Sequence, residues 1–136
     1  GVTCATCGDD GVVRIWDTRS HSHPVGEMAP GHAHWAWCVT YNPEYDQLIA
    51  SGGGDQCVRL WVDAGNSSGG GAKGGGNAAV QKTHSCVSVY DGCHADTVYG
   101  VAWGRGDDPW TFASVSYDGH VAIEKVPRAE KYRILL

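Results

Sequence analysis

The sequence predicts an all-β fold built from repeated antiparallel sheets, and three observations support this prediction. Short runs rich in Val, Ile, Thr and Trp alternate with turn residues along most of the chain, whereas helical periodicity is nearly absent. The strings GDDG, GGGD and YDG between such runs are typical of tight hairpin turns. Three segments also resemble one another position by position, which indicates an internal repeat.

The pattern predicts nine strands in chain order. Each is rich in β-branched or aromatic residues, which suit a pleated and half-buried segment. The expected strands cover residues 3–7, 12–16, 35–41, 46–51, 57–62, 85–90, 97–103, 110–116 and 120–126. The C-terminal stretch VPRAEKYRILL, residues 126–136, is expected to contain a further strand. That strand is either the outer strand of the last sheet or one that pairs with the N-terminal part of the protein.

The repeat is defined by three segments that align without gaps, at 6–16, 51–61 and 114–124. Each begins with Ser or Thr and has Asp at its fifth place. The first two end in Trp, where the third has Glu124. Residues 31–41 and 93–103 align in the same way. The aligned aspartates are 45 and 63 positions apart. An insertion of about 18 residues explains the longer spacing, and removing it restores a period of roughly 40–45 residues.

The insertion is the block GNSSGGGAKGGGN, residues 65–77, which has the composition of a flexible linker. It lacks the Gly-Lys-Ser/Thr order of a phosphate-binding loop, so no nucleotide site is expected there. We expect residues 64–82 or so to loop out between the third and fourth strands of one sheet. The chain then divides into a partial unit at 1–30, a unit at 31–92 and a last unit with the C-terminal tail at 93–136.

The strings IWD at 15–17 and GH at 31–32, with the aligned aspartates, resemble the WD repeats of a β-propeller, whose blades have four antiparallel strands. In that family a polar tetrad ties the turn before the innermost strand to the two middle strands. The resemblance implies a central tetrad and two partial ones, which are His32, Ser51, Asp55 and Trp61, then Thr6, Asp10 and Trp16, then His94, Ser114 and Asp118. Physical chemistry agrees, since a buried carboxylate needs donors and a buried indole N–H needs an acceptor.

Two other interpretations of these residues are less favoured. His21, His23, His32 and His34 lie close to Cys38 and could bind a metal ion, but the histidines belong to different predicted loops. Ser, His and Asp are also the residue types of a hydrolase triad. Here they recur in register in the next repeat, as structural tetrads do. We therefore expect no enzymatic activity, no metal, no cofactor and no small-molecule substrate.

Composition excludes further classes of partner. The net charge is -5 and no basic stripe is present, which argues against nucleic-acid binding. No apolar run approaches the roughly 20 residues of a membrane span, so no direct membrane insertion is expected. The six cysteines lack the spacing of a secreted disulfide scaffold, which predicts reduced thiols in a cytoplasmic protein. The chain begins at Gly1 within strand-like sequence, and the resemblance to WD-repeat propellers implies about three C-terminal blades of a seven-bladed propeller.

The C-terminal segment DPWTFASVSYDGHVAIEKVPRAEKYRILL, residues 108–136, resembles the EARP-and-GARP-complex-interacting protein family, also called the TSSC group. Residues 5–19, 31–48 and 90–103 fit the same family. The resemblance implies a non-enzymatic WD-repeat adaptor that associates with endosomal and Golgi vesicle-tethering complexes. Such an adaptor supports endosomal recycling and retrograde transport to the trans-Golgi network, and is peripheral to both compartments.

The string WDTR supports an alternative function. Trp16, Asp17 and Arg19 resemble the WDxR box of substrate receptors for cullin-4 ubiquitin ligases, and a plant branch of the same family is described in that way. In those receptors the arginine helps to dock damaged-DNA-binding protein 1, and a nuclear location becomes compatible. The structural alternative is that Trp16 packs between blades and Asp17 turns the chain.

Propellers commonly bind partners where the strand-entry loops and the middle-strand turns emerge. On this chain the candidate partner surface comprises His34 and Trp35 at one entry, Asp96 and Thr97 at the next, and Asp9 and Tyr117 before two of the aligned aspartates. Trp and Tyr are favoured anchors in interfaces. The alternative for Trp35 is partial burial between blades.

Overall fold

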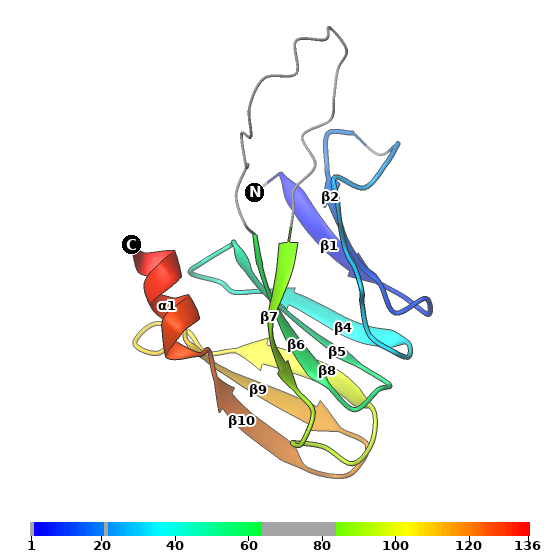
Figure 1. Ribbon diagram of the computed structural model, residues 1–136, viewed down its shortest axis with the longest axis vertical. Coiled ribbons are helices and arrows are strands. Elements are labelled where there is room, and N and C mark those ends of the chain that lie inside the picture. The colour runs from blue at the N-terminus through cyan, green and yellow to red at the C-terminus, as the bar shows by residue number, and fades with distance from the viewer. Residues whose placement is uncertain (1, 21, 64–83) are drawn as a thin grey trace, which may run out of the picture.

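The computed structural model describes residues 2–20, 22–63 and 84–136. Within these ranges the chain forms three antiparallel sheets and one short helix (Figure 1). In each sheet the strands pair in chain order, so every sheet is built from consecutive local pairings. The all-β prediction is confirmed, with the exception of the C-terminal helix.

The second sheet is the largest and has the order β4-β5-β6-β7. Its neighbours have the orders β1-β2-β3 and β8-β9-β10. The strand bounds are β1 Thr3–Cys7, β2 Val13–Asp17, β3 Gly26–Met28, β4 Ala36–Tyr41, β5 Leu48–Gly53, β6 Val58–Asp63, β7 His84–Tyr90, β8 Val98–Trp103, β9 Thr111–Ser116 and β10 Val121–Lys125. The expected Gly-rich loop falls between β6 and β7 and lies outside the described residues.

The second sheet packs on both faces, which places the core between the sheets. Ile49 and Trp61 face the first sheet, where they join Val13, Ile15 and Met28. A second cluster lies between the second and third sheets and comprises Leu48, Ala50, Val58, Leu60, Val62, Val98, Trp110, Phe112 and Val126. Successive residues of a strand point to opposite faces. All six residues of β5 are therefore buried, because this strand lies inside the sheet and both of its faces are covered.

Three hairpin turns lie at one end of the sheets, which we call the hairpin end (Figure 1). They are the turns β1–β2, β5–β6 and β9–β10, at residues 8–12, 54–57 and 117–120. Gly11 and Gly119 have φ of 75° and 82°, a conformation that side chains disfavour. At Gly11 a Cβ atom would also collide with the carbonyl oxygen of His32. The turn strings predicted from the sequence therefore sit where this backbone requires glycine.

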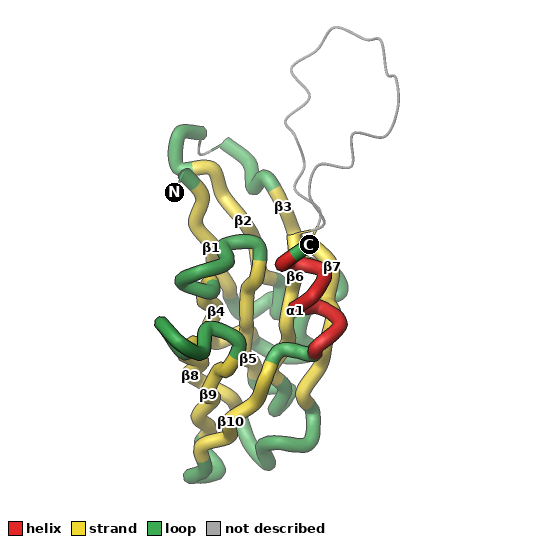
Figure 2. Tube along the Cα trace, turned by 90° about the vertical axis from the view of Figure 1, so that its left-hand side faces the viewer, coloured by secondary structure: helices red, strands yellow, loops and turns green. Residues whose placement is uncertain are grey.

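The C-terminal segment corrects one prediction. Residues Arg128–Leu135 form the helix α1, so the expectation of a strand in 126–136 is wrong. The strand β10 ends at Lys125. Val126, which is buried, and then Pro127 follow, and proline has no N–H to continue the ladder. The residues that follow include Ala, Glu, Lys, Arg and Leu, which favour helix. Figure 2 shows α1 at the flank of the sheets, beside β6 and β7.

One further element, the short strand β3, was not predicted. Strand β3 has three residues and carries Gly26 and Met28 instead of β-branched residues, so its sequence lacks a strand signal. It pairs with β2 because Val13 and Ile15 align with Met28 and Gly26. The helix α1 has eight residues, and no helix in the described ranges is long and apolar enough to cross a membrane.

The packing of β6 leads to a direct test. Leu60 is fully buried between the second and third sheets, whereas Leu135 on α1 is about half exposed. Leu60→Ala should lower the free energy of unfolding of the full-length protein by about 2–5 kcal/mol, because it opens a cavity in the core. Leu135→Ala is the matched control and should change it by roughly 0.5 kcal/mol or less. Chemical denaturation measures both, and equal effects would contradict the described core.

Candidate partner-binding surface

A chain of hydrogen bonds links four side chains of the second sheet. Trp61 on β6 donates its indole N–H to the hydroxyl oxygen of Ser51 on β5, at 2.9 Å. Ser51 Oγ lies 2.8 Å from His32 Nε2, and His32 Nδ1 lies 2.9 Å from Asp55 Oδ1. The structure thus brings together His32, Ser51, Asp55 and Trp61, which come from the strand-entry loop, β5, the hairpin turn and β6.

The chemistry of these groups fixes the direction of each hydrogen bond. An indole N–H can only donate and a carboxylate can only accept. Ser51 Oγ accepts from Trp61, and its own hydrogen is then donated to His32 Nε2. His32 must therefore be the neutral tautomer with hydrogen on Nδ1, which it donates to Asp55. All four side chains have a partner, so the network is closed.

The charges in the network agree with this assignment. Burial lowers the pKa of His32 below its ordinary value, although the Asp55 carboxylate acts in the opposite direction. Burial acts to raise the pKa of Asp55. The hydrogen bonds that it accepts from His32 and from the backbone N–H groups of Ala33 and Cys57 outweigh burial, so this pKa is lowered. A neutral imidazole thus faces an ionised carboxylate.

The carboxylate of Asp55 also positions the strand-entry loop. Its Oδ2 accepts the backbone N–H of Ala33 at 3.0 Å, and its Oδ1 accepts that of Cys57 at 3.3 Å. Ala33 precedes His34 and Trp35, which belong to the candidate partner surface. The backbone N–H of Gly54 donates to the carbonyl of Trp35 at 2.8 Å. The entry loop and the hairpin turn are thereby held against each other.

The third sheet repeats the arrangement without a tryptophan. His94 Nε2 lies 2.8 Å from Ser114 Oγ, and His94 Nδ1 lies 3.2 Å from Asp118 Oδ2. Asp118 also accepts the backbone N–H groups of Ala95 and His120, at 2.9 and 2.8 Å. These bonds, led by that from Ala95, lower the pKa of Asp118 to about 2.

Two departures from the repeat meet in the third sheet. Cys93 stands where the second unit has Gly31, and Glu124 stands where it has Trp61. The thiol of Cys93 donates to the Glu124 carboxylate at 3.0 Å. Burial and this hydrogen bond raise the pKa of Cys93 to about 11, so the thiol stays protonated. The sequence alignment showed Glu124 at the Trp position but did not predict its contact with Cys93, which their shared repeat unit could have suggested.

The first sheet keeps only part of the pattern. Trp16 donates its indole N–H to Thr6 Oγ1 at 2.8 Å. The carboxylate of Asp10 does not join this pair. It contacts Arg14 at 2.7 Å and accepts the backbone N–H of Val12. The described residues supply no histidine to this sheet's network, which leaves Asp10 available to an arginine.

The geometry of these networks suits structure better than catalysis. Ser51 and Ser114 are buried, and each hydroxyl is taken up by its histidine. A substrate cannot reach either oxygen without opening a sheet. His23 is exposed, and His21 lies outside the described residues. Within the described ranges no group of three or more metal-ligating side chains converges, and all six cysteines are free thiols.

The candidate partner surface lies at the hairpin end, next to the hydrogen-bond networks. Asp9 is exposed in the β1–β2 turn, and His34 and Trp35 are exposed at the entry to β4. Asp96 is exposed at the entry to β8, whereas Thr97 is half-buried. Trp35 is 49% exposed and Tyr117 is 66% exposed, so neither ring is enclosed between sheets. The surface therefore presents aromatic rings and carboxylates together.

Two aromatic residues of this surface were missed. Trp37 and Tyr99 lie within β4 and β8, at β-bulges where the pairing with the neighbouring strand skips one residue. They are 47% and 45% exposed. Trp37 lies 5.8 Å from the Trp35 ring, and Tyr99 lies 4.7 Å from the Tyr117 ring. Bulges redirect side chains and are common beside functional sites. The available sequence signal was an aromatic residue five positions after each network histidine.

The WDTR string is folded into a local turn. Arg19 donates through Nε and Nη2 to the two carboxylate oxygens of Asp17, at 2.9 and 2.6 Å. The backbone N–H of Arg19 donates to the same carboxylate, at 2.9 Å. The Arg19 side chain remains 71% exposed, so Asp17 fixes a guanidinium at the protein surface.

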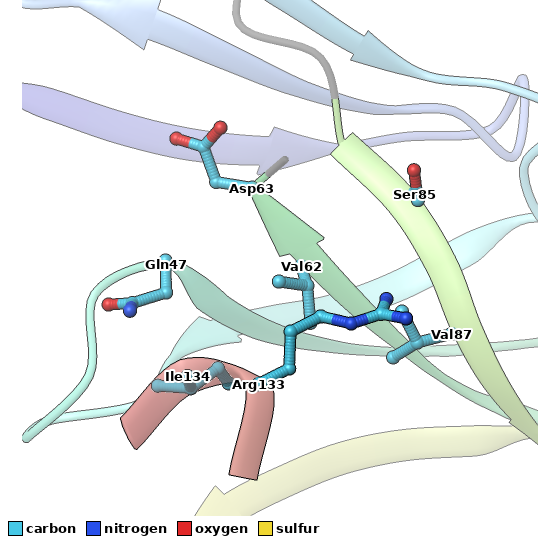
Figure 3. A pocket seen from close by; sticks show the side chains of 7 residues that line it. All are labelled: Gln47, Val62, Asp63, Ser85, Val87, Arg133 and Ile134. Atoms are coloured by element: carbon cyan, nitrogen blue, oxygen red, sulfur yellow. The ribbon is translucent and has the colours of Figure 1, made fainter. Parts of the chain in front are cut away.

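A hollow lies at the end of the second sheet opposite the hairpin end, beside α1 (Figure 3). Its volume is about 420 Å³. Val62 and Val87 form its apolar part, and the side chain of Arg133 extends from α1 between them. Gln47, Asp63 and Ser85 lie at its margin. Sequence reasoning did not predict this hollow, because it depends on the helix that was expected to be a strand.

Comparison with known proteins gives a consistent result. The family model "WD domain, G-beta repeat" matches residues 1–17 and 22–62. The chain is 42% identical to EARP-interacting protein 1 of Caenorhabditis elegans, covering 96% of this chain and 38% of that protein. It is 39% identical to EARP and GARP complex-interacting protein 1 of Homo sapiens, covering 97% and 37%. It is 43% identical to WD repeat-containing protein DWA2 of Arabidopsis thaliana, covering 79% and 30%. The chain thus spans less than two-fifths of the length of these relatives.

The histidine networks of the second and third sheets differ in one donor, the Trp61 N–H, and this difference can be measured. Ser51→Ala orphans both the Trp61 N–H and His32 Nε2, whereas Ser114→Ala orphans only His94 Nε2. Each unsatisfied buried group costs about 1–3 kcal/mol. Ser51→Ala should therefore destabilise the full-length protein about twice as much as Ser114→Ala. Denaturant titration compares the two variants, and a larger effect at Ser114 would contradict the assigned hydrogen bonds.

The lowered pKa values predict acid sensitivity. The folded state binds the proton of His32 more weakly than the unfolded state, where the pKa is 6.5. This contribution to stability is complete above pH 6.5 and is lost as the pH falls through the folded pKa of His32. Asp118 adds a contribution that is complete above pH 3.8 and is lost as the pH falls toward 2.

An NMR titration of the His32 imidazole in the full-length protein checks the first of these contributions. The midpoint should lie below pH 6.5, and the melting temperature should fall with the protonation of this ring. A midpoint at or above that value would show that the ring is not held neutral.

Proposed function

Because the chain belongs to the WD-repeat proteins and is homologous over nearly its whole length to the EARP-and-GARP-complex-interacting proteins, we propose that it acts as a non-enzymatic adaptor. Its partners are subunits of the EARP and GARP vesicle-tethering complexes. The main support is that the worm relative is named for interaction with EARP and the human relative for interaction with the EARP and GARP complexes. The adaptor works in the cytoplasm at endosomes and the trans-Golgi network, where it supports recycling and retrograde transport.

The surface chemistry supports protein binding. Half-exposed tryptophan and tyrosine rings are typical anchors of protein interfaces. Trp35 lies two residues after Ala33, whose backbone N–H donates to Asp55. Tyr117 directly precedes Asp118, which accepts the backbone N–H of Ala95. A partner therefore meets aromatic groups that are already positioned, and less conformational entropy is lost on binding. Catalysis is a poor fit, since the Ser51 and Ser114 hydroxyls that contact His32 and His94 are buried.

The ligase alternative has one supporting observation. Arg19 is exposed and its guanidinium is oriented by Asp17, as a docking arginine would need to be. Under this alternative the protein is a substrate receptor that docks damaged-DNA-binding protein 1 of a cullin-4 ligase.

Affinity purification of the full-length protein separates the two proposals. Tether subunits recovered equally with wild type and Arg19→Ala would support the adaptor. Recovery of damaged-DNA-binding protein 1 and cullin-4 with wild type, and their loss with Arg19→Ala, would support the ligase receptor. The control is Arg105→Ala, which removes another exposed arginine that follows a strand. A loss of any partner with both variants would indicate a general charge effect instead of docking.

The aromatic surface has its own test. The double variant Trp35→Ala with Tyr117→Ala should reduce tether recovery at least about fivefold while the melting temperature stays close to that of wild type. The matched control is Tyr132→Ala on α1, which removes a similarly exposed ring at the opposite end of the sheets. If the double variant folds normally and recovers tethers in full, the partner binds elsewhere.

A further inference from the structure

A hollow of about 320 Å³ lies at the hairpin end, between the first and second sheets. One side is formed by the end of β1 and the following turn, and the other by the entry to β4. Its lining comprises Cys7, Gly8, Asp9, Trp35, Ala36 and Trp37. Sequence reasoning placed Asp9 and Trp35 on one surface, and the structure brings them to the same hollow.

The two indole rings of this hollow differ from three other tryptophans, whose N–H groups are hydrogen-bonded. Trp16, Trp61 and Trp103 each donate their N–H to an oxygen of the chain. Across the residues that the structure describes, the N–H groups of Trp35 and Trp37 have no hydrogen-bond partner. Both rings are about half exposed, and their centroids are 5.8 Å apart. The exposed parts of these rings and their N–H groups therefore remain available to a ligand.

A carboxylate without a partner accompanies the rings. Asp9 is exposed and forms no hydrogen bond or ion pair with any described residue. The arginine of the same hairpin cannot neutralise it, because Arg14 is already paired with Asp10 at 2.7 Å and with Glu27 at 3.0 Å. The chain as a whole carries a net charge of -5. The hollow therefore combines a negative charge with electron-rich aromatic faces.

We propose that this hollow binds an arginine side chain from a basic segment of the protein partner. The guanidinium would stack on the Trp35 and Trp37 rings and pair with the Asp9 carboxylate. Tryptophan is the strongest aromatic partner for a cation, and a planar guanidinium both stacks on a ring and forms paired hydrogen bonds with a carboxylate. The inference deepens the proposed adaptor function and rests on it for the identity of the partner as a protein.

The equivalent position of the next sheet supports access to the hollow. Tyr99 occupies the same bulge position as Trp37. It is also about half exposed, although β4 and β8 lie alongside each other. The bulged ring is therefore about half exposed in both places. In the case of Tyr99 this exposure persists with the inner strand β4 beside β8.

The test uses the full-length protein labelled with 5-fluorotryptophan and two small probes. N-acetyl-arginine amide carries the guanidinium, and N-acetyl-citrulline amide has the same shape without the charge. Fluorine NMR should show saturable shifts of the Trp35 and Trp37 signals with the arginine probe, and binding at least about threefold weaker with citrulline. Asp9→Asn should weaken arginine binding by about threefold to tenfold. Asp107→Asn removes an exposed carboxylate outside the hollow and outside the candidate partner surface, and should leave arginine binding unchanged.

Equal binding of the two probes, or equal weakening by Asp9→Asn and Asp107→Asn, would overturn the proposal. So would shifts confined to tryptophans other than Trp35 and Trp37. The adaptor function fails separately, by loss of tether subunits from the wild-type purification. Tether recovery without arginine binding would reject only the arginine site. Arginine binding without tether recovery would retain the site and reject the adaptor function.

Discussion

The carboxylate of Asp55 is the group on which the arrangement of the second sheet depends. A carboxylate can only accept hydrogen bonds, and this one accepts from three donors in two segments of the chain. His32 and Ala33 belong to the entry of the inner strand, and Cys57 belongs to the hairpin turn. Because the donors come from both segments and share one acceptor, the carboxylate ties the entry loop to the turn. The positions of His34 and Trp35 follow from this link.

The third sheet shows that the carboxylate matters more than the complete tetrad. Asp118 binds His94, Ala95 and His120 in the same manner, although no tryptophan reaches Ser114. The place of the indole is taken by Glu124, which finds its own donor in the Cys93 thiol. The repeat therefore tolerates a change in its outer member as long as the new polar group is satisfied locally. Asp10 in the first sheet marks the limit, since without a histidine it turns to Arg14.

Much of this could be predicted from the sequence, for physical reasons that also explain the failures. Strand β6 was predictable because its Val and Trp residues suit a buried strand, and β5 because its apolar run precedes a tight-turn string. The polar contacts of His32 were predicted through the resemblance to WD repeats, whose tetrad positions the aligned residues occupy. The helix α1 was missed because a short segment after a strand carries little periodicity. The bulged rings Trp37 and Tyr99 were missed because a bulge is a property of strand pairing, which one strand alone does not reveal.

The contrast between the tryptophans links the fold to the proposed role. Trp61 is buried and gives its N–H to Ser51, so this indole serves the fold. An indole that remains half exposed with no such bond, as Trp37 does, contributes little to the closed networks. Exposing large apolar rings carries a cost in solubility, and the bulge that exposes them recurs in two sheets. At the β4 bulge Trp37 lies beside Trp35 and the carboxylate of Asp9, which is the arrangement that the proposed arginine site uses. The networks below it supply rigidity, and the rings and carboxylate supply the chemistry of recognition.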